Sequence, residues 1–423
     1  MRRPSIPPVL HDGNFARYLA ANSVSTLGSG MATVALAFAV LNTGGVTELG
    51  IVLLAREIPL IVFVLLGGVF ADRLRRRTIL VGTDLLKATA QILTAALFFS
   101  GNPDVVAVSL LQIAYGSANA FSGPATTGLI REVVSDEELQ EANALLGLSH
   151  SILSIVAPAV GALIVAAGSP ALALALDAAS FVASAGLTFT ITIAGRVRIA
   201  ATSLMADLRG GWSEFVARPW AVAMILSFGV FQLSFFPALN VLGPSVAQTS
   251  LGGPAAWGLM LSFESVGAVI GGLVALRLRV KRPLVACQIF VIPCGFLLIG
   301  LGVPAALVVL LLLSALVGFG FAAGNTFWMT ALQQNVPEHA LSRISSFDWL
   351  GSVAFNPIGY LLVGPISIAV GTSQTLIVSG LINMAAAVGV LLLPSVRRIQ
   401  MVSRVTSQAA VEPAVPGPLS ELS

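Results

Sequence analysis

The sequence predicts an all-α polytopic membrane protein, with twelve transmembrane helices arranged as two parallel six-helix repeats. Of the 423 residues, 56% are apolar and only 10% are charged, whereas an ordinary soluble domain has about 25% charged residues. The apolar residues also form continuous runs long enough to cross a bilayer, which takes ~20 residues per helix. This composition excludes a soluble enzyme, a disordered chain and a nucleic-acid-binding domain.

Polar residues, glycines and prolines separate the apolar runs and mark the helix ends. After an N-terminal segment, 1–16, we expect an N-terminal six-helix bundle over 17–194, with helices at 17–41, 48–70, 78–99, 105–127, 143–167 and 171–194. A connection, 195–218, leads to a C-terminal six-helix bundle over 219–393, with helices at 219–247, 255–276, 283–301, 305–332, 344–366 and 371–393. The tail, 394–423, shows no periodicity and is predicted to be disordered.

The basic residues indicate how the helices are oriented. The connections at 42–47, 100–104, 168–170, 248–254, 302–304 and 367–370 contain no Lys or Arg, whereas the alternate connections hold most of the 22 basic residues. Because basic loops stay on the cytoplasmic side, we expect both termini and the 195–218 connection in the cytoplasm. That connection is basic and amphipathic, which predicts an interfacial helix. Arginine outnumbers lysine twenty to two, which favours a GC-rich bacterial source and therefore a bacterial plasma or inner membrane.

The two halves of the chain contain related segments. Gly67-Gly68-Val69-Phe70-Ala71-Asp72-Arg73 in the first half matches Gly271-Gly272-Leu273-Val274-Ala275-Leu276-Arg277 in the second, at an offset of 204 residues. Asn119-Ala120-Phe121 matches Asn325-Thr326-Phe327 at an offset of 206 residues. An offset of this size indicates that one six-helix unit is repeated with the same membrane orientation, as parallel repeats in transporters are.

The connection between the second and third helices carries a recognisable motif. Gly68, Asp72, Arg73, Arg76 and Arg77 are spaced as in the corresponding loop signature of the major facilitator superfamily, although Arg75 stands where the family usually has a second glycine. With the parallel repeat, this motif makes the chain resemble that superfamily over about 15–395. The resemblance implies a gating loop in which Asp72 pairs with, or caps, the eleventh helix near Arg343–Ser346. The alternative is a positive-inside loop with no gating role.

Four further segments resemble the drug-exporter branch that includes macrolide efflux proteins and the enterobactin exporter. They are residues 20–30, 55–59, 141–144 and 177–181. The resemblance implies a secondary exporter of small organic compounds that works by alternating access coupled to proton entry. The usual arginine of the fourth helix is replaced by Gln112, and the fifth-helix signature keeps its kink and small-residue packing in Pro158 and Gly161 but has lost two glycines. These departures put proton antiport by the usual fourth-helix route in doubt.

Ionisable residues within helices are costly, at least ~2.5–3.5 kcal/mol on insertion scales, so they are expected to be paired or functional. We expect Asp84 and Lys87 to neutralise each other one turn apart, and Asp177 to pair with Arg56. The proton-coupling or cavity candidates are the charged residues Arg56, Glu57, Asp177 and Glu264, with His150 as a weaker proton-relay candidate. The alternative for each is a structural contact.

Polar residues on other helices are candidates for a substrate cavity. They are Asn22, Gln112, Gln232 and Asn240. Four phenylalanines of the seventh helix either line a hydrophobic substrate cavity or face lipid; they are Phe228, Phe231, Phe235 and Phe236.

Three alternatives to a broad exporter remain open from the sequence. They are a dedicated exporter of a siderophore or self-made antibiotic, a lipid-modifying membrane enzyme, and a non-transporting sensor. The sequence has no nucleotide-binding loop, catalytic constellation or metal-ligand cluster, so we expect no enzymatic activity, cofactor or metal. The predicted partners are the lipid bilayer, a small-molecule substrate and the proton, with no nucleic acid and no indication of an oligomer.

Overall fold

The computed structural model describes residues 8–66, 75–101, 103–135, 137–192, 212, 214–303, 305–337, 340, 344, 345, 347, 348, 351 and 354–401. A short 3-10 turn, η1 (Pro8–His11), precedes the first half of the fold. The first half then consists of α1 (Gly13–Thr43), α2 (Val46–Leu66), α3 (Arg76–Phe99), α4 (Val105–Val133), α5 (Leu139–Ala166) and α6 (Pro170–Phe189). The second half contains α8 (Pro219–Pro237), η3 (Ala238–Leu242), α9 (Gly243–Ser250), α10 (Pro254–Arg277), α11 (Pro283–Gly302), α12 (Leu307–Asn335), α14 (Asn356–Val370), α15 (Thr372–Leu392) and α16 (Pro394–Arg397).

Ten helices among the described residues are long and apolar enough to cross a membrane, with α8, η3 and α9 counted as one. The helix α2 and the shorter apolar helix α14 lie at the positions predicted for the second and eleventh spans. Residue types at the helix starts explain several of the bounds. The carboxylates of Asp12 and Asp104 accept backbone N–H groups at the starts of α1 and α4, and proline occupies the first turn of α6, α8, α10 and α11, where its missing N–H costs nothing.

Some helix ends are shifted by several residues, as in α4, which continues to Val133 instead of ending at 127. Two further differences change the elements themselves. The seventh span was predicted as one helix over 219–247, but a π-helical turn, Ala238–Leu242, interrupts it and the span continues to Ser250. The start of the predicted disordered tail forms the short helix α16, in which Val396 is buried. Most of the 195–218 connection and the tail beyond Met401 lie outside the described residues.

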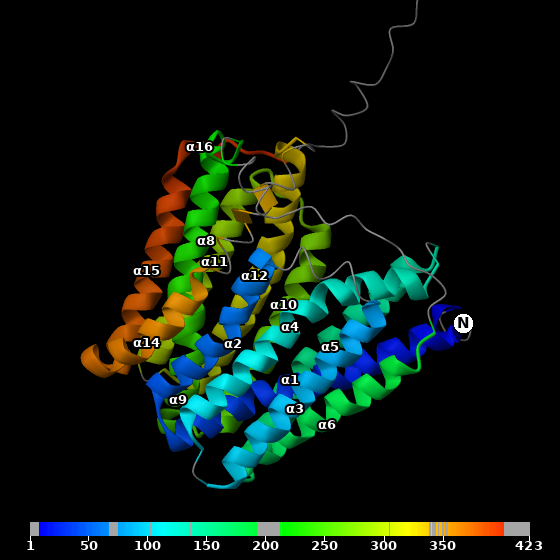
Figure 1. The fold of residues 1–423 in the computed structure, drawn as a ribbon. Coiled ribbons are helices and arrows are strands. Elements are labelled where there is room, and N and C mark those ends of the chain that lie inside the picture. Colours follow the sequence, from blue (N-terminus) through cyan, green and yellow to red (C-terminus); the bar gives the residue numbers. More distant parts are fainter. Residues whose placement is uncertain are drawn as a thin grey trace, which may run out of the picture.

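The helices pack as two groups that meet along one seam. In the first group α1 packs on α5 and α6, α3 on α4 and α6, and α2 on α4. In the second group α12 packs on α10 and α11, and α15 on α8 and α11. The main contacts between the groups are α5 with α10 and α2 with α14. Figure 1 shows the groups splayed apart at one face of the molecule and converging at the other.

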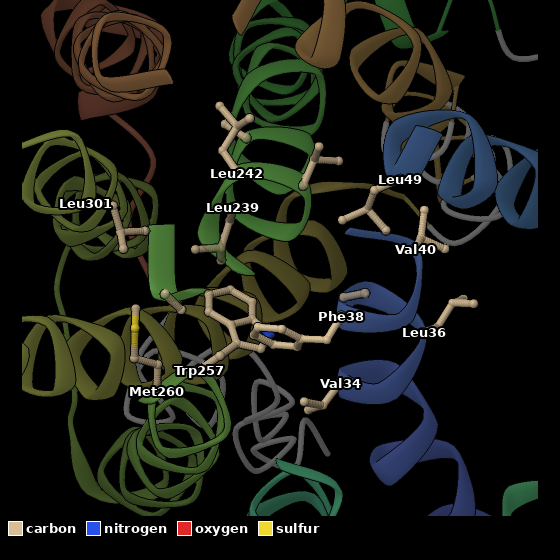
Figure 2. Close-up of a cluster of buried hydrophobic side chains, with 14 of the residues drawn as sticks. Val34, Leu36, Phe38, Val40, Leu49, Leu239, Leu242, Trp257, Met260 and Leu301 are labelled. Carbon is tan, nitrogen blue, oxygen red and sulfur yellow. The ribbon is translucent and has the colours of Figure 1, made fainter. Parts of the chain in front are cut away.

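We call the splayed face, where α1 begins at Gly13 and α15 ends at Leu392, the terminal face. The converging face, where α1 ends at Thr43 and α15 begins at Thr372, is the distal face. Near the distal face a buried apolar cluster joins the two groups. Figure 2 shows Phe38 of α1 pointing toward Trp257 of α10, with Leu49, Leu239 and Leu242 in the same cluster. This apolar cluster closes the distal half of the seam.

Candidate functional site

A cavity of about 540 Å³ lies between the two groups of helices, a volume within the range of small-molecule sites. Five helices of the first group and α10 of the second supply its wall. The lining residues include Tyr18, Asn22, Ser25, Thr26, Ser29, Thr33, Leu80, Asp84, Lys87, Asn119, Ser122, Thr126, His150, Ser154, Pro158, Phe181, Ser184, Thr188, Glu264 and Ser265. The wall extends from residues near the terminal face, such as Tyr18 and Thr188, to mid-depth residues such as Thr33 and Glu264.

Helix α1 contributes a polar stripe to this wall. Asn22, Ser25, Ser29 and Thr33 follow one another at three- and four-residue spacing, which places them on one side of the helix. The hydroxyl of Ser25 donates to the Asn22 carbonyl at 3.2 Å, and that of Thr33 donates to the Ser29 carbonyl at 2.9 Å. Each of these hydroxyl oxygens keeps lone pairs that can accept hydrogen bonds from a bound molecule. Asn22, predicted as a cavity residue, therefore does line the cavity.

The two charged residues of α3 also line the cavity. Their charges interact, as predicted, but their side chains form no direct ion pair. Asp84 accepts a hydrogen bond from the Ser184 hydroxyl at 2.7 Å. The ammonium of Lys87 lies 3.3 Å from the Ser122 hydroxyl and 5.3 Å from the centre of the Phe181 ring. Both side chains hydrogen-bond across to neighbouring helices, Asp84 to α6 and Lys87 to α4.

Within the described part of the second group, Glu264 is the only acidic residue that lines this wall. Among the described residues, its carboxylate has no hydrogen bond and no ion pair. His150 of α5 lines the same cavity. Glu57, the predicted counterpart of Glu264, is half-buried in α2 and does not line this cavity. The structure thus separates the two carboxylates that the repeat had grouped together.

Asp177 and Arg56 do not form the predicted direct ion pair, although their charges interact. Asp177, which is fully buried, accepts a hydrogen bond from the Gln91 amide at 2.6 Å. The Arg56 guanidinium instead stacks over the Tyr115 ring, 4.1 Å from its centre. The packing explains the difference, because α6 faces α1 and α3, whereas α2 faces α4 and α14.

The other predicted cavity residues lie elsewhere. Gln112 is fully buried and donates to Gln91 and Thr94, so it extends the Asp177 network. Asn240 donates to the Tyr360 hydroxyl at 2.9 Å, and Gln232 is half-buried outside the wall of this cavity. Phe231 and Phe235 are buried in an aromatic cluster with Phe236 and Phe321, while Phe228 is partly exposed. None of the four seventh-span phenylalanines lines this cavity.

Only part of the predicted gating loop is described. Gly68, Asp72 and Arg73, and the predicted partner segment Arg343–Ser346 apart from Ile344 and Ser345, lie outside the described residues. Arg76 forms an ion pair with Glu132 at 3.3 Å. Arg77 donates to the Ile191 carbonyl at 2.7 Å. These two arginines therefore connect the start of α3 with the ends of α4 and α6, all within the first group.

Small residues bring the helices close together along the seam. A Cβ atom added to Gly161 of α5 would lie 2.7 Å from the Met31 backbone of α1. A Cβ on Gly258 of α10 would lie 2.9 Å from the Pro158 carbonyl oxygen. The candidate kink residues Pro158 and Gly161 thus lie where α5 is packed between α1 and α10.

Direct contacts close the distal face. A Cβ added to Gly50 of α2 would lie 2.6 Å from the Tyr360 carbonyl oxygen of α14, and one on Gly364 would lie 2.6 Å from the Thr47 backbone. The amide of Gln248 donates to Asn42 at 2.7 Å. The cavity is therefore bordered by a closed seam toward the distal face, whereas the helix groups diverge toward the terminal face (Figure 1).

The arrangement of two six-helix groups around a central cavity agrees with comparison against protein families. The Major Facilitator Superfamily model matches residues 18–352. This chain belongs to the Major Facilitator Superfamily. The predicted resemblance and the predicted all-α membrane fold are thereby confirmed.

Among individual proteins, the chain is similar to bacterial efflux proteins. It is 25% identical to the multidrug efflux pump Tap of Mycolicibacterium fortuitum over 398 residues, which cover 89% of this chain and 95% of that protein. It is 24% identical to macrolide efflux protein A of Streptococcus pyogenes, with 90% and 96% covered. It is 27% identical to the enterobactin exporter EntS of Shigella boydii, with 71% and 72% covered. These relatives match the branch predicted from the sequence.

Solved structures share the fold. A mutant of the nucleoside transporter NupG is 14% identical, with a TM-score of 0.75 and coverage of 89% of this chain and 99% of that one. A bacterial homologue of the iron transporter ferroportin, in an inward-facing state, is 15% identical with a TM-score of 0.68 and coverage of 90% and 99%.

Proposed function

We propose that this chain is a secondary active exporter of small organic compounds, driven by proton entry. The observation that carries the proposal is the polar cavity, which a closed apolar seam separates from the distal face while the two helix groups diverge toward the terminal face. A site with access from one side is what alternating access requires. The similarity to efflux pumps at 24–27% identity supports export as the direction.

The orientation of the chain follows from its basic residues. Arg75, Arg76 and Arg77 lie at the terminal face, as do Arg277, Arg279 and Lys281. Because basic residues stay on the cytoplasmic side, we place both termini in the cytoplasm of a bacterial cell. The structure then corresponds to an inward-facing state, in which substrate enters the cavity from the cytoplasm. Rocking of the two bundles, 17–194 and 219–393, would expose the same cavity to the outside.

Glu264 is the residue best placed to couple this motion to protons. A carboxylate at mid-depth is costly unless it is paired or functional, and this one faces the cavity with no partner among the described residues. It faces a wall that also carries Asp84, Lys87 and His150. A proton and a substrate that both interact with Glu264 would exclude each other, as antiport requires.

The gating role of the loop between α2 and α3 stays a prediction. If Asp72 stabilises one state, Asp72→Asn should leave the protein inserted but slow transport. Wild-type turnover by inserted Asp72→Asn protein would contradict this role.

The function is tested by measuring accumulation of a panel of dyes and antibiotics in efflux-deficient bacterial cells, with and without this protein. Each comparison is repeated with a protonophore. Lower accumulation of several unrelated compounds, lost when the proton gradient collapses, is the expected result. Reduced accumulation of one compound alone would instead favour a dedicated exporter, for which the similarity to an enterobactin exporter makes a siderophore the first candidate. Unchanged accumulation of every compound, with inserted protein present, would contradict the export proposal.

A further inference from the structure

The seam between α5 and α10 contains two hydrogen bonds that cross from one helix group to the other. The Ser265 hydroxyl of α10 donates to the Ser154 carbonyl of α5 at 2.8 Å. One turn away, the Ser262 hydroxyl donates to the Ile155 carbonyl at 2.7 Å. Side-chain hydroxyls inside helices usually bond to a carbonyl of their own helix one turn back, as Ser151 of α5 does with the Gly147 carbonyl. Ser262 and Ser265 bond across the seam instead.

Pro158 explains why α5 can accept such a bond. In an α-helix the carbonyl of residue 154 would accept the N–H of residue 158, but proline has no N–H. The Ser154 carbonyl therefore loses its partner within α5. A carbonyl that lacks a donor costs free energy when water is excluded from it. Ser154 is half-buried at the seam, and the Ser265 hydroxyl supplies the missing donor from the opposite helix group. The proline of the fifth span thus creates an acceptor for the second half of the molecule.

These bonds lie at the boundary between the closed seam and the cavity. Ser154, Pro158 and Ser265 line the cavity together with Glu264, which is adjacent to Ser265 in α10. Toward the distal face, Gly258 packs directly on the Pro158 carbonyl and the Ala162 side chain. The bonds therefore hold the last part of the seam that remains closed before the helices diverge.

We propose that Ser265 and Ser262 form a latch with the α5 carbonyls around Pro158, and that this latch stabilises the state in which the distal face is closed. Opening of the distal face requires α10 to separate from α5, which breaks both bonds and leaves the Ser154 carbonyl without a donor. Because Glu264 is adjacent to Ser265, a cation or proton that binds the Glu264 carboxylate changes the charge beside the latch. The inference rests on the proposed alternating access and adds the residues that bias its equilibrium.

The test measures conformation rather than transport, so failure of the latch can be distinguished from failure of the export proposal. Spin labels are placed on the full-length protein at Ser100→Cys and Val303→Cys, which lie at the distal ends of α3 and α11, after Cys287 and Cys294 are replaced by alanine. Pulsed electron–electron distance measurements then give the fractions with the distal face closed and open. A second pair, Ser135→Cys and Arg279→Cys, reports the terminal face.

Ser265→Ala should increase the ratio of open to closed distal faces by roughly three- to tenfold, the size expected for one hydrogen bond. Ser265→Thr keeps the hydroxyl and should restore the wild-type ratio. Ser151→Ala, the matched control, removes a hydroxyl that bonds within its own helix and should leave the ratio unchanged.

The role of Pro158 is tested by a double-mutant cycle. Pro158→Ala restores the N–H, so the Ser154 carbonyl regains a donor within α5, and adding Ser265→Ala to this variant should change the ratio little. Equal effects of Ser265→Ala with and without Pro158 would overturn the role given to the proline. Distances for Ser265→Ala that match those of Ser151→Ala would overturn the latch itself.

Discussion

Helix α1 borders two different environments along its length. Between Tyr18 and Thr33 its inward side carries the polar stripe of the cavity, whereas Val34, Leu36, Phe38 and Val40 of the next two turns are buried in the apolar seam (Figure 2). The two environments meet near Thr33, because Ala32 already belongs to the apolar cluster while Thr33 still lines the cavity. One helix thus contributes both to the polar site and to the barrier that closes it.

The difference shows how a membrane protein divides the bilayer thickness between access and closure. Polar groups are tolerated at membrane depth only where they bond to one another or line an aqueous space. Apolar side chains and glycines give close packing between helices where the space is closed. Helix α10 shows the same division, with Trp257 and Gly258 in the seam and Glu264 and Ser265 at the cavity. Changes on either side of this boundary should therefore have different effects.

The largest effect is expected from the cavity carboxylate. Glu264→Gln keeps the shape of the side chain, but the amide cannot bind and release a proton. Transport should therefore lose its dependence on the proton gradient. Glu57→Gln is the matched control, because Glu57 does not line this cavity, and it should keep that dependence. The protonophore-sensitive part of efflux is the measurement. Retention of full protonophore sensitivity by Glu264→Gln would place the coupling site elsewhere.

The next effect comes from the closed seam. Gly50→Ala places a Cβ 2.6 Å from the Tyr360 carbonyl oxygen, and such overpacking costs about 1–3 kcal/mol. Because Gly50 and Tyr360 are in close contact in this closed seam, the variant should shift the protein toward the open distal face in the Ser100–Val303 distance measurement. Gly82→Ala has nothing within 4 Å of the added atom and should cause no shift. Identical distance distributions for the two variants would show that this contact does not hold the seam.

A third change affects stability without affecting the conformational equilibrium. Glu132→Gln removes the ion pair with Arg76. The side chains of Glu132 and Arg76 are only 8% and 16% exposed, so the loss should lower the free energy of unfolding by about 1–3 kcal/mol. Both residues belong to the first helix group, so the open-to-closed ratio should not change. Thermal unfolding in detergent measures the first expectation and spin-label distances measure the second. A changed ratio with unaltered stability would indicate a direct gating role for Arg76.

The smallest effect is expected at the distal surface. Gln248→Ala removes an exposed hydrogen bond to Asn42, which contributes at most about 0.5–1.5 kcal/mol, so the distal face should open slightly more often. Thr249→Ala removes a hydroxyl that bonds to Ser245 in its own helix and serves as the control. An effect of Gln248→Ala larger than that of Gly50→Ala would mean that polar contacts, rather than close packing, close the distal face.

The sequence predicted the helices well because a bilayer imposes their length and apolar character. Observed helices such as Pro254–Arg277 and Pro283–Gly302 begin and end within one or two residues of the predicted bounds. The π-helical turn at Ala238–Leu242 was not predicted, since its residues, apart from Asn240, are as apolar as the helix around it. Hydropathy reports where a helix lies in the membrane but not whether one of its turns widens.

Side-chain partners were predicted less well. Asp177 was assigned to Arg56 and bonds to Gln91, and Asp84 was assigned to Lys87 and bonds to Ser184. In both cases the partner depends on which helices are neighbours and how each is rotated, and neither follows from spacing along one helix. The polar stripe of α1 could have been predicted from the sequence, because Asn22, Ser25, Ser29 and Thr33 recur at helical spacing in an otherwise apolar run. The latch depends on a contact between two helices that are distant in sequence, and no spacing of residues along either helix predicts it.

In the proposed arrangement one cavity opens toward the cytoplasm while the distal seam closes it from outside. The accessibility of a cysteine at Ser25 tests this arrangement, in protein whose Cys287 and Cys294 are replaced by alanine. Membrane-impermeant thiol reagents are applied to inside-out and right-side-out vesicles. We expect rapid labelling of Ser25→Cys in inside-out vesicles and little labelling in right-side-out vesicles. Labelling that is faster in right-side-out vesicles would contradict it.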